Sequence, residues 1–130
     1  MAFIIKNIAS GLVLDVRGDH RTNGAEVILF SFHGRDNQLW EYKNNMIVSK
    51  ASGLVLDISG GTHGSPIITF KGHGGGNQKW YFDDDFTIRS GTGMVLDIQG
   101  GAMVQGAKLI GFTKHGGANQ KFRVVPHNRR

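Results

Sequence analysis

The chain has 130 residues, of which 39% are hydrophobic and 19% charged, and it contains no cysteine. This size suits one domain with a hydrophobic core, and the composition excludes an intrinsically disordered chain, a disulfide and a thiolate metal site. The formal net charge of +5 is spread along the chain rather than gathered in a basic stripe, so we expect no nucleic acid partner.

Short apolar segments, separated by glycines and polar residues, predict strands from the start of the chain. In the first 43 residues the expected strands cover 3–8, 12–16, 27–32 and 39–42. The 20 glycines, against 2 prolines, suit many short strands joined by tight turns. The fold is therefore expected to be all-β.

Sequence blocks of this first unit recur twice further along the chain. The segment GLVLDV at 11–16 returns as GLVLDI at 53–58 and as GMVLDI at 93–98. An Asn-Gln pair followed two residues later by an aromatic residue occurs at 37–40, 77–80 and 119–122. Between these blocks a His lies three residues after a Phe in every copy. The pattern predicts three repeats of about four strands, at about 1–43, 44–83 and 84–130, with pseudo-threefold symmetry.

A period near 40 residues also fits a propeller blade. A propeller has four or more blades, however, and this chain has room for three units. One unit could not bury its apolar face alone, whereas three can pool their apolar faces and leave no long unpaired edge. We therefore expect a single domain over 1–130.

The Gln-x-Trp triplets are similar to those of the ricin B-chain lectin family. They lie at 38–40 and 78–80, and at 120–122 with Phe in place of Trp. The resemblance covers essentially the whole chain, and it implies a β-trefoil that recognises terminal galactose or N-acetylgalactosamine. It also implies that the triplets are mostly structural, and we place Trp40, Trp80 and Phe122 in the core.

The same resemblance implies a set of sugar-binding residues in each copy. The set comprises the Asp of the Leu-Asp pair, an aromatic residue for stacking and the Asn before the triplet, with a nearby His as a further hydrogen-bond donor or pocket wall. The candidates are Asp15, Phe30, His33, Asn37, Asp57, Phe70, His73, Asn77, Asp97, Phe112, His115 and Asn119. The aromatic residue is Phe in each copy, where Trp or Tyr is usual in the family.

These residue types suit a galactose ring, which has an apolar face and a fan of hydroxyls. We expect an exposed Asp carboxylate to accept hydrogen bonds from the axial 4-hydroxyl and the 3-hydroxyl, and the Asn amide to donate to the 3-hydroxyl. Asp57 and Phe70 are 13 residues apart, against 15 for the equivalent pairs. The second pocket is therefore expected to differ most.

Several alternatives remain open. Each Asp could form a turn, the three Phe could be core residues, and the chain could be a non-sugar β-trefoil that binds heparin-like polyanions or a protein partner. We expect no enzyme, because the polar set is triplicated rather than gathered in one cleft. Pseudo-threefold symmetry separates the three histidines, so no metal site and no cofactor is expected.

The expected partners are galactose-terminated glycoproteins or glycolipids at cell surfaces, bound in a multivalent, agglutinin-like manner. No apolar stretch long enough to cross a bilayer is present, and residues 1–6 do not have the pattern of a signal peptide. We therefore expect a soluble protein without membrane insertion, acting outside the cell or stored in the cytoplasm. A homodimer is left open.

Overall fold

The computed structural model describes residues 1–127, which form twelve short strands and six one-turn 3-10 helices. The last three residues of the third predicted repeat, 128–130, lie outside the described residues. The strands are β1 (Phe3–Asn7), β2 (Val13–Val16), β3 (Ala25–Phe30), β4 (Trp40–Lys43), β5 (Met46–Ser49), β6 (Val55–Ile58), β7 (Ile67–Phe70), β8 (Trp80–Phe82), β9 (Ile88–Ser90), β10 (Val95–Ile98), β11 (Leu109–Phe112) and β12 (Phe122–Pro126). The one-turn helices are η1 (Arg17–Asp19), η2 (Asp36–Gln38), η3 (Ser59–Gly61), η4 (Gly76–Gln78), η5 (Gln99–Gly101) and η6 (Ala118–Gln120).

All four strands expected in the first 43 residues are present, with ends displaced by one or two residues. The largest difference is at β3, which begins at Ala25 rather than at 27. Ala25 pairs with Thr69 and Glu26 pairs with Ile68, both in β7. This extension is set by pairing with a distant strand, which the local apolar pattern does not reveal.

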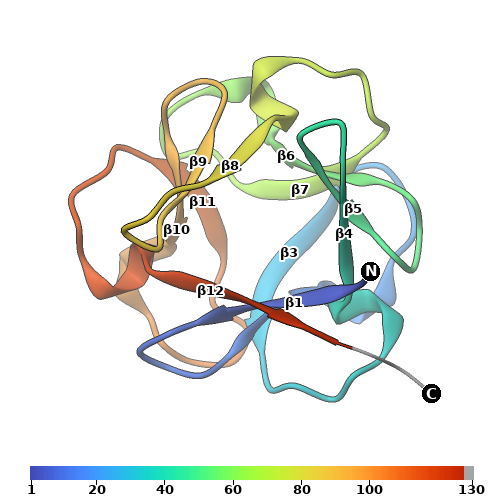
Figure 1. Cartoon of the computed structure of the whole chain (residues 1–130), viewed down its shortest axis with the longest axis horizontal. Coiled ribbons are helices and arrows are strands. Elements are labelled where there is room, and N and C mark those ends of the chain that lie inside the picture. Colours follow the sequence, from blue (N-terminus) through green and yellow to red (C-terminus); the bar gives the residue numbers. More distant parts are fainter. Residues whose placement is uncertain (128–130) are drawn as a thin grey trace.

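Antiparallel pairs arrange the strands as three lobes around a common axis (Figure 1). Hairpins form from β2 with β3, β6 with β7, and β10 with β11. Strand β1 pairs with both β4 and β12, so the first and last strands of the described chain lie side by side (Figure 1). This all-β arrangement is the β-trefoil that the resemblance implied.

The aromatic residues that end the three triplets lie in the core, as the sequence predicted. Trp40 and Trp80 are 0% exposed and Phe122 is 2% exposed. The Trp80 Nε1 donates to the Leu56 carbonyl at 3.0 Å, whereas the buried Trp40 Nε1 has no hydrogen-bond partner within residues 1–127. Equivalent aromatic residues in the repeats are therefore buried alike, but only one of the two indole N–H groups has a hydrogen-bond partner among the described residues.

A glycine turn joins each lobe to the next. The Gly24 N–H donates to the Thr69 carbonyl at 2.8 Å, and the other two joints are Gly64 to Gly111 at 2.7 Å and Gly106 to Leu29 at 2.8 Å. The φ angles of these turn glycines are +85°, +81° and +87°, a backbone conformation that side chains disfavour. The loop of one repeat is thus held against the hairpin of its neighbour.

Candidate functional site

The hairpin register brings the predicted Asp and Phe of each repeat to the same face. In the first repeat Asp15 lies opposite Ile28, and Phe30 follows Ile28 by two residues. Residues directly opposite in an antiparallel pair share a face, and so do residues two apart in one strand. The equivalent opposite pairs are Asp57 with Ile68 and Asp97 with Ile110.

A buried glutamine holds each carboxylate. In the first repeat the Gln38 Nε2 donates to Asp15 Oδ2 and to the Ser31 carbonyl, both at 2.8 Å. The Gln38 Oε1 accepts the His33 backbone N–H at 2.8 Å. The glutamines of the other two repeats make the same three bonds, at distances from 2.7 to 2.9 Å. Each glutamine therefore links the backbone of the loop that carries the His to the Asp carboxylate.

The Asn beside each glutamine donates its amide hydrogens to the protein. The Asn37 Nδ2 lies 3.0 Å from the Val16 carbonyl and 3.4 Å from Asp15 Oδ1, and the other two repeats repeat both contacts. Because both partners are acceptors, the orientation of the amide is fixed. Both amide hydrogens thus face protein acceptors, and donation from this amide to a sugar stays a prediction. The Asn37 Oδ1 accepts no hydrogen bond from the described residues.

Each histidine accepts at one ring nitrogen and directs the other toward the carboxylate. The His33 Nδ1 accepts the Arg35 backbone N–H at 3.0 Å, and its Nε2 lies 3.5 Å from Asp15 Oδ2. The equivalent Nε2 distances are 3.9 Å for His73 and 3.5 Å for His115. A neutral imidazole that accepts at Nδ1 carries its proton at Nε2. Each site thus has an N–H donor beside its carboxylate.

The three carboxylates are buried, and the expectation that they are exposed is wrong. Asp15, Asp57 and Asp97 are 3%, 4% and 2% exposed because the neighbouring amides cover them. Burial raises the pKa of Asp15 above its ordinary 3.8, against the opposing effects of the Gln38 hydrogen bond and His33. Burial raises the pKa of Asp97 in the same way. A carboxylate in such surroundings makes stronger hydrogen bonds than one in water.

A hollow opens beside each carboxylate, and all four predicted residues of the repeat line it. The volumes are about 500 Å³ in the first repeat, about 200 Å³ in the second and about 370 Å³ in the third. The small second hollow accompanies the shorter spacing from Asp57 to Phe70. Phe30 and Phe70 are 38% and 37% exposed, and Phe112 is half-buried. The alternative that these phenylalanines are core residues is therefore wrong.

The first hollow differs from the other two at the residue two positions after the His. This residue is Arg35 in the first repeat, whereas Gly75 and Gly117 stand there in the other two. A Cβ added at Gly75 or Gly117 would lie 2.8 Å from the neighbouring His ring. The second and third sites therefore leave no room for a side chain at this position, whereas the first carries Arg35, which lines its hollow.

Comparison with known proteins identifies the family. Residues 1–127 match the family model of the ricin-type beta-trefoil lectin domain. The chain belongs to this family. The lectin is similar to the designed 3-fold symmetric protein ThreeFoil, with 30% identity, a TM-score of 0.88, and coverage of 97% of this chain and 99% of that one.

Two earthworm structures are also similar to this lectin. The C-half of the earthworm R-type lectin, solved in complex with GalNAc, has 28% identity and a TM-score of 0.84, covering 95% of this chain and 97% of that one. A mutant of the earthworm lectin C-terminal domain, solved with 6'-sialyllactose, has 26% identity and a TM-score of 0.81 over the same coverage. Like its family, the lectin is a carbohydrate-binding protein.

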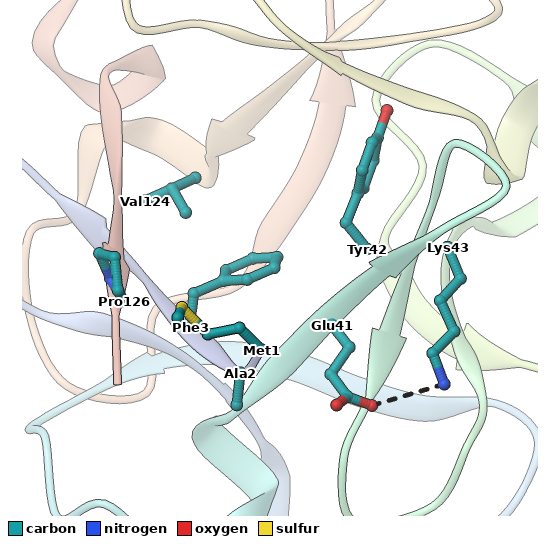
Figure 2. A pocket seen from close by; sticks show the side chains of 8 residues that line it. All are labelled: Met1, Ala2, Phe3, Glu41, Tyr42, Lys43, Val124 and Pro126. Carbon is teal, nitrogen blue, oxygen red and sulfur yellow. Dashed lines mark ion pairs between the residues drawn. The ribbon is translucent and has the colours of Figure 1, made fainter. Parts of the chain in front are cut away.

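A further hollow of the lectin, of about 300 Å³, lies between β1, β4 and β12 (Figure 2). Figure 2 shows the rings of Phe3 and Tyr42 and the side chain of Val124 bordering this space. The Glu41–Lys43 ion pair, at 3.7 Å, lies at its edge. This hollow contains none of the predicted sugar-binding residues.

Two properties of the described residues concern metals and membranes. Residues 1–127 contain no group of three or more His, Asp or Glu side chains arranged to hold a metal ion. None of the helices in that part of the lectin is long and apolar enough to cross a membrane.

Sequence reasoning missed two kinds of site residue. The first is the isoleucine that faces each Asp and lines each hollow, found at 28, 68 and 110. Its recurrence two residues before each Phe was an available signal. The second is the one-turn helix after each Asp, which lines the hollow with residues 17–19 in the first repeat, 59–60 in the second and 100–101 in the third.

Proposed function

We propose that this lectin binds terminal galactose or N-acetylgalactosamine through up to three equivalent sites. The observation that carries the proposal is the recurrence, in each repeat, of a buried carboxylate beside an accessible Phe ring. A site that serves only to form a turn does not need either the hollow or the accessible ring. The family membership and the GalNAc complex of the similar earthworm lectin support the same sugar class.

The hydrogen-bonding capacity of each site matches a pair of neighbouring hydroxyls. A carboxylate has about four acceptor positions, and Asp15 uses one on each oxygen for Gln38 and Asn37. The remaining positions accept the 3- and 4-hydroxyls of galactose, and the Asn37 Oδ1 accepts a further hydrogen. His33 supplies a donor for a hydroxyl oxygen.

The Phe ring supplies the stereochemical selection. In galactose the axial 4-hydroxyl leaves the C–H bonds of carbons 3, 4 and 5 on one face, and an aromatic ring packs against such an apolar face. Glucose and mannose carry an equatorial 4-hydroxyl. With that configuration one sugar orientation cannot both place the apolar face on the Phe ring and direct the 3- and 4-hydroxyls to the carboxylate. The 2-position is not used, so an acetamido group there is accepted.

We further propose that binding occurs without chemistry on the sugar. Glycoside hydrolysis normally needs two facing carboxyl groups, but the second and third hollows are each lined by one. In the first hollow the additional carboxylate, Asp19, is paired with Arg21 at 3.0 Å. Three weak sites on one domain instead gain strength by engaging a cell-surface glycan together.

Calorimetric titration tests the proposal. Galactose and N-acetylgalactosamine should bind with a stoichiometry near three, and glucose and mannose should give no heat of binding. The variants Phe30→Ala, Phe70→Ala and Phe112→Ala should each remove one site while leaving the melting temperature nearly unchanged, because these rings are outside the core. A preference for mannose, or unchanged binding by the triple variant, would refute the proposal.

A further inference from the structure

Each candidate site receives a side chain from the preceding repeat. Asn23, His63 and Gln105 occupy equivalent positions, immediately before the turn glycines that join the lobes. Asn23 belongs to the first repeat and reaches the second, His63 reaches from the second to the third, and Gln105 reaches from the third to the first.

In the first and second sites this side chain holds the backbone just after the stacking Phe. The Gln105 Oε1 accepts the Ser31 backbone N–H at 3.2 Å and the Ser31 hydroxyl at 2.8 Å. The Asn23 Oδ1 accepts the Lys71 backbone N–H at 2.8 Å. Ser31 and Lys71 directly follow Phe30 and Phe70 in the sequence. These two sites therefore have their strand ends fixed by an amide, while the rings themselves stay exposed.

The third site is built differently, because His63 contacts the ring itself. The centroids of the His63 and Phe112 rings are 4.2 Å apart, and the ring planes are inclined by 37°. His63 is exposed and is not among the residues that line the third hollow. The His63 ring thus packs on Phe112, and Phe112 itself is among the residues that line the third hollow. His115, of the same repeat, contacts the ring edge-on with centroids 6.1 Å apart.

We propose that His63 is a positioning residue of the third site, which holds the Phe112 ring in the orientation that receives the apolar face of a galactoside. The inference rests on the proposed function. An exposed Phe loses side-chain freedom when a sugar stacks on it, and a ring already held by a second aromatic ring has less freedom to lose. The third site is therefore the tightest of the three for galactosides, by the two- to tenfold that corresponds to ordering one side chain on binding, about 0.5 to 1.5 kcal/mol.

Site-resolved NMR titration of the full chain with methyl galactoside tests this assignment. The backbone amides of Arg35, Gly75 and Gly117 report the three sites separately, because each donates to the His Nδ1 of its own site at 3.0 Å. His63→Ala removes the ring, and His63→Phe keeps an aromatic ring at the same place. His127→Ala is the matched control, since His127 contacts the Phe32 ring edge-on with centroids 5.6 Å apart, and neither residue lines any of the three hollows.

We expect His63→Ala to raise the dissociation constant reported by Gly117 about two- to tenfold, with no change at Arg35 and Gly75. His63→Phe should restore the affinity, and His127→Ala should alter none of the three. An unchanged or tighter third site in His63→Ala, or a failure of His63→Phe to restore it, overturns the assignment of His63 alone. If none of the three amides of the wild-type protein responds to galactoside, the proposed function fails and this inference with it.

Discussion

Replacing Trp80 by Phe should destabilise the lectin more than replacing Trp40 by Phe. Both indoles are fully buried at equivalent places in their repeats, so the two substitutions remove the same atoms from similar packing. The third repeat already carries Phe122 at this place. Only the Trp80 Nε1 donates to an acceptor among the described residues, the Leu56 carbonyl. The comparison therefore isolates one hydrogen bond.

The expected difference follows from the cost of unpaired buried groups. Trp80→Phe leaves the Leu56 carbonyl without its donor, whereas Trp40→Phe removes an N–H group that has no hydrogen-bond partner within residues 1–127. An unsatisfied buried group costs about 1 to 3 kcal/mol, so we expect a difference of about 2 kcal/mol in the free energy of unfolding. With an unfolding entropy of about 2.1 cal/mol/K per residue, a chain of 130 residues shows this as about 7 °C in melting temperature.

Chemical denaturation and scanning calorimetry of the two single variants measure this difference. Galactose binding at 25 °C serves as the check that both variants are folded before they are compared. Equal melting temperatures, or a lower one for Trp40→Phe, would show that packing rather than the hydrogen bond decides stability at this place.

Three further results are expected. Asp97→Asn should abolish binding at the third site. It should also lower the free energy of unfolding by about 1 to 2 kcal/mol, because the Asn119 or the Gln120 amide loses its acceptor. An unchanged denaturation curve contradicts this expectation. Acidification should remove binding at the first and third sites while the pH is still above 3.8, because burial raises the pKa of Asp15 and Asp97. Protonation of these two groups should not itself unfold the protein, since a raised carboxyl pKa contributes stability below pH 3.8 that is lost as the pH rises through the raised value. Calorimetry and circular dichroism between about pH 6 and pH 4 separate the two effects, and binding that persists until the fold is lost contradicts the reasoning. Galactose affinity should be nearly the same in about 0.05 M and 0.5 M salt, because the ligand is neutral; a steep loss would favour a polyanion partner.

The fold and most candidate residues could be predicted because they recur. The Leu-Asp pair, the Phe, the His and the Asn-Gln pair each occur at matching places in the repeats, and a single occurrence of any of them would have been weak. The burial of Asp15 could not be predicted, because it depends on Gln38, which is 23 residues away and reaches it only through the hairpin fold. The orientation of the Asn37 amide likewise depends on the Val16 carbonyl in another element.

The contacts between repeats could not be predicted from the sequence for a different reason. Asn23, His63 and Gln105 serve equivalent places with different side chains, so only the glycine that follows each of them recurs in the sequence. Their partners belong to the next repeat, and local periodicity carries no information about contacts across that distance. Sequence symmetry thus revealed what the copies share, and the structure was needed to show where they differ.

The pairing of β1 with β12 has a consequence for how the chain folds. Phe3 lies opposite Pro126, so this ladder joins residues from almost the two extremes of the sequence. Closing so long a loop has a large entropic cost, and β-proteins dominated by such pairings fold in milliseconds to seconds rather than microseconds. Until that ladder forms, β1 and β12 expose unpaired edges that can join another chain. Dilute refolding should therefore favour recovery of the native lectin over aggregation.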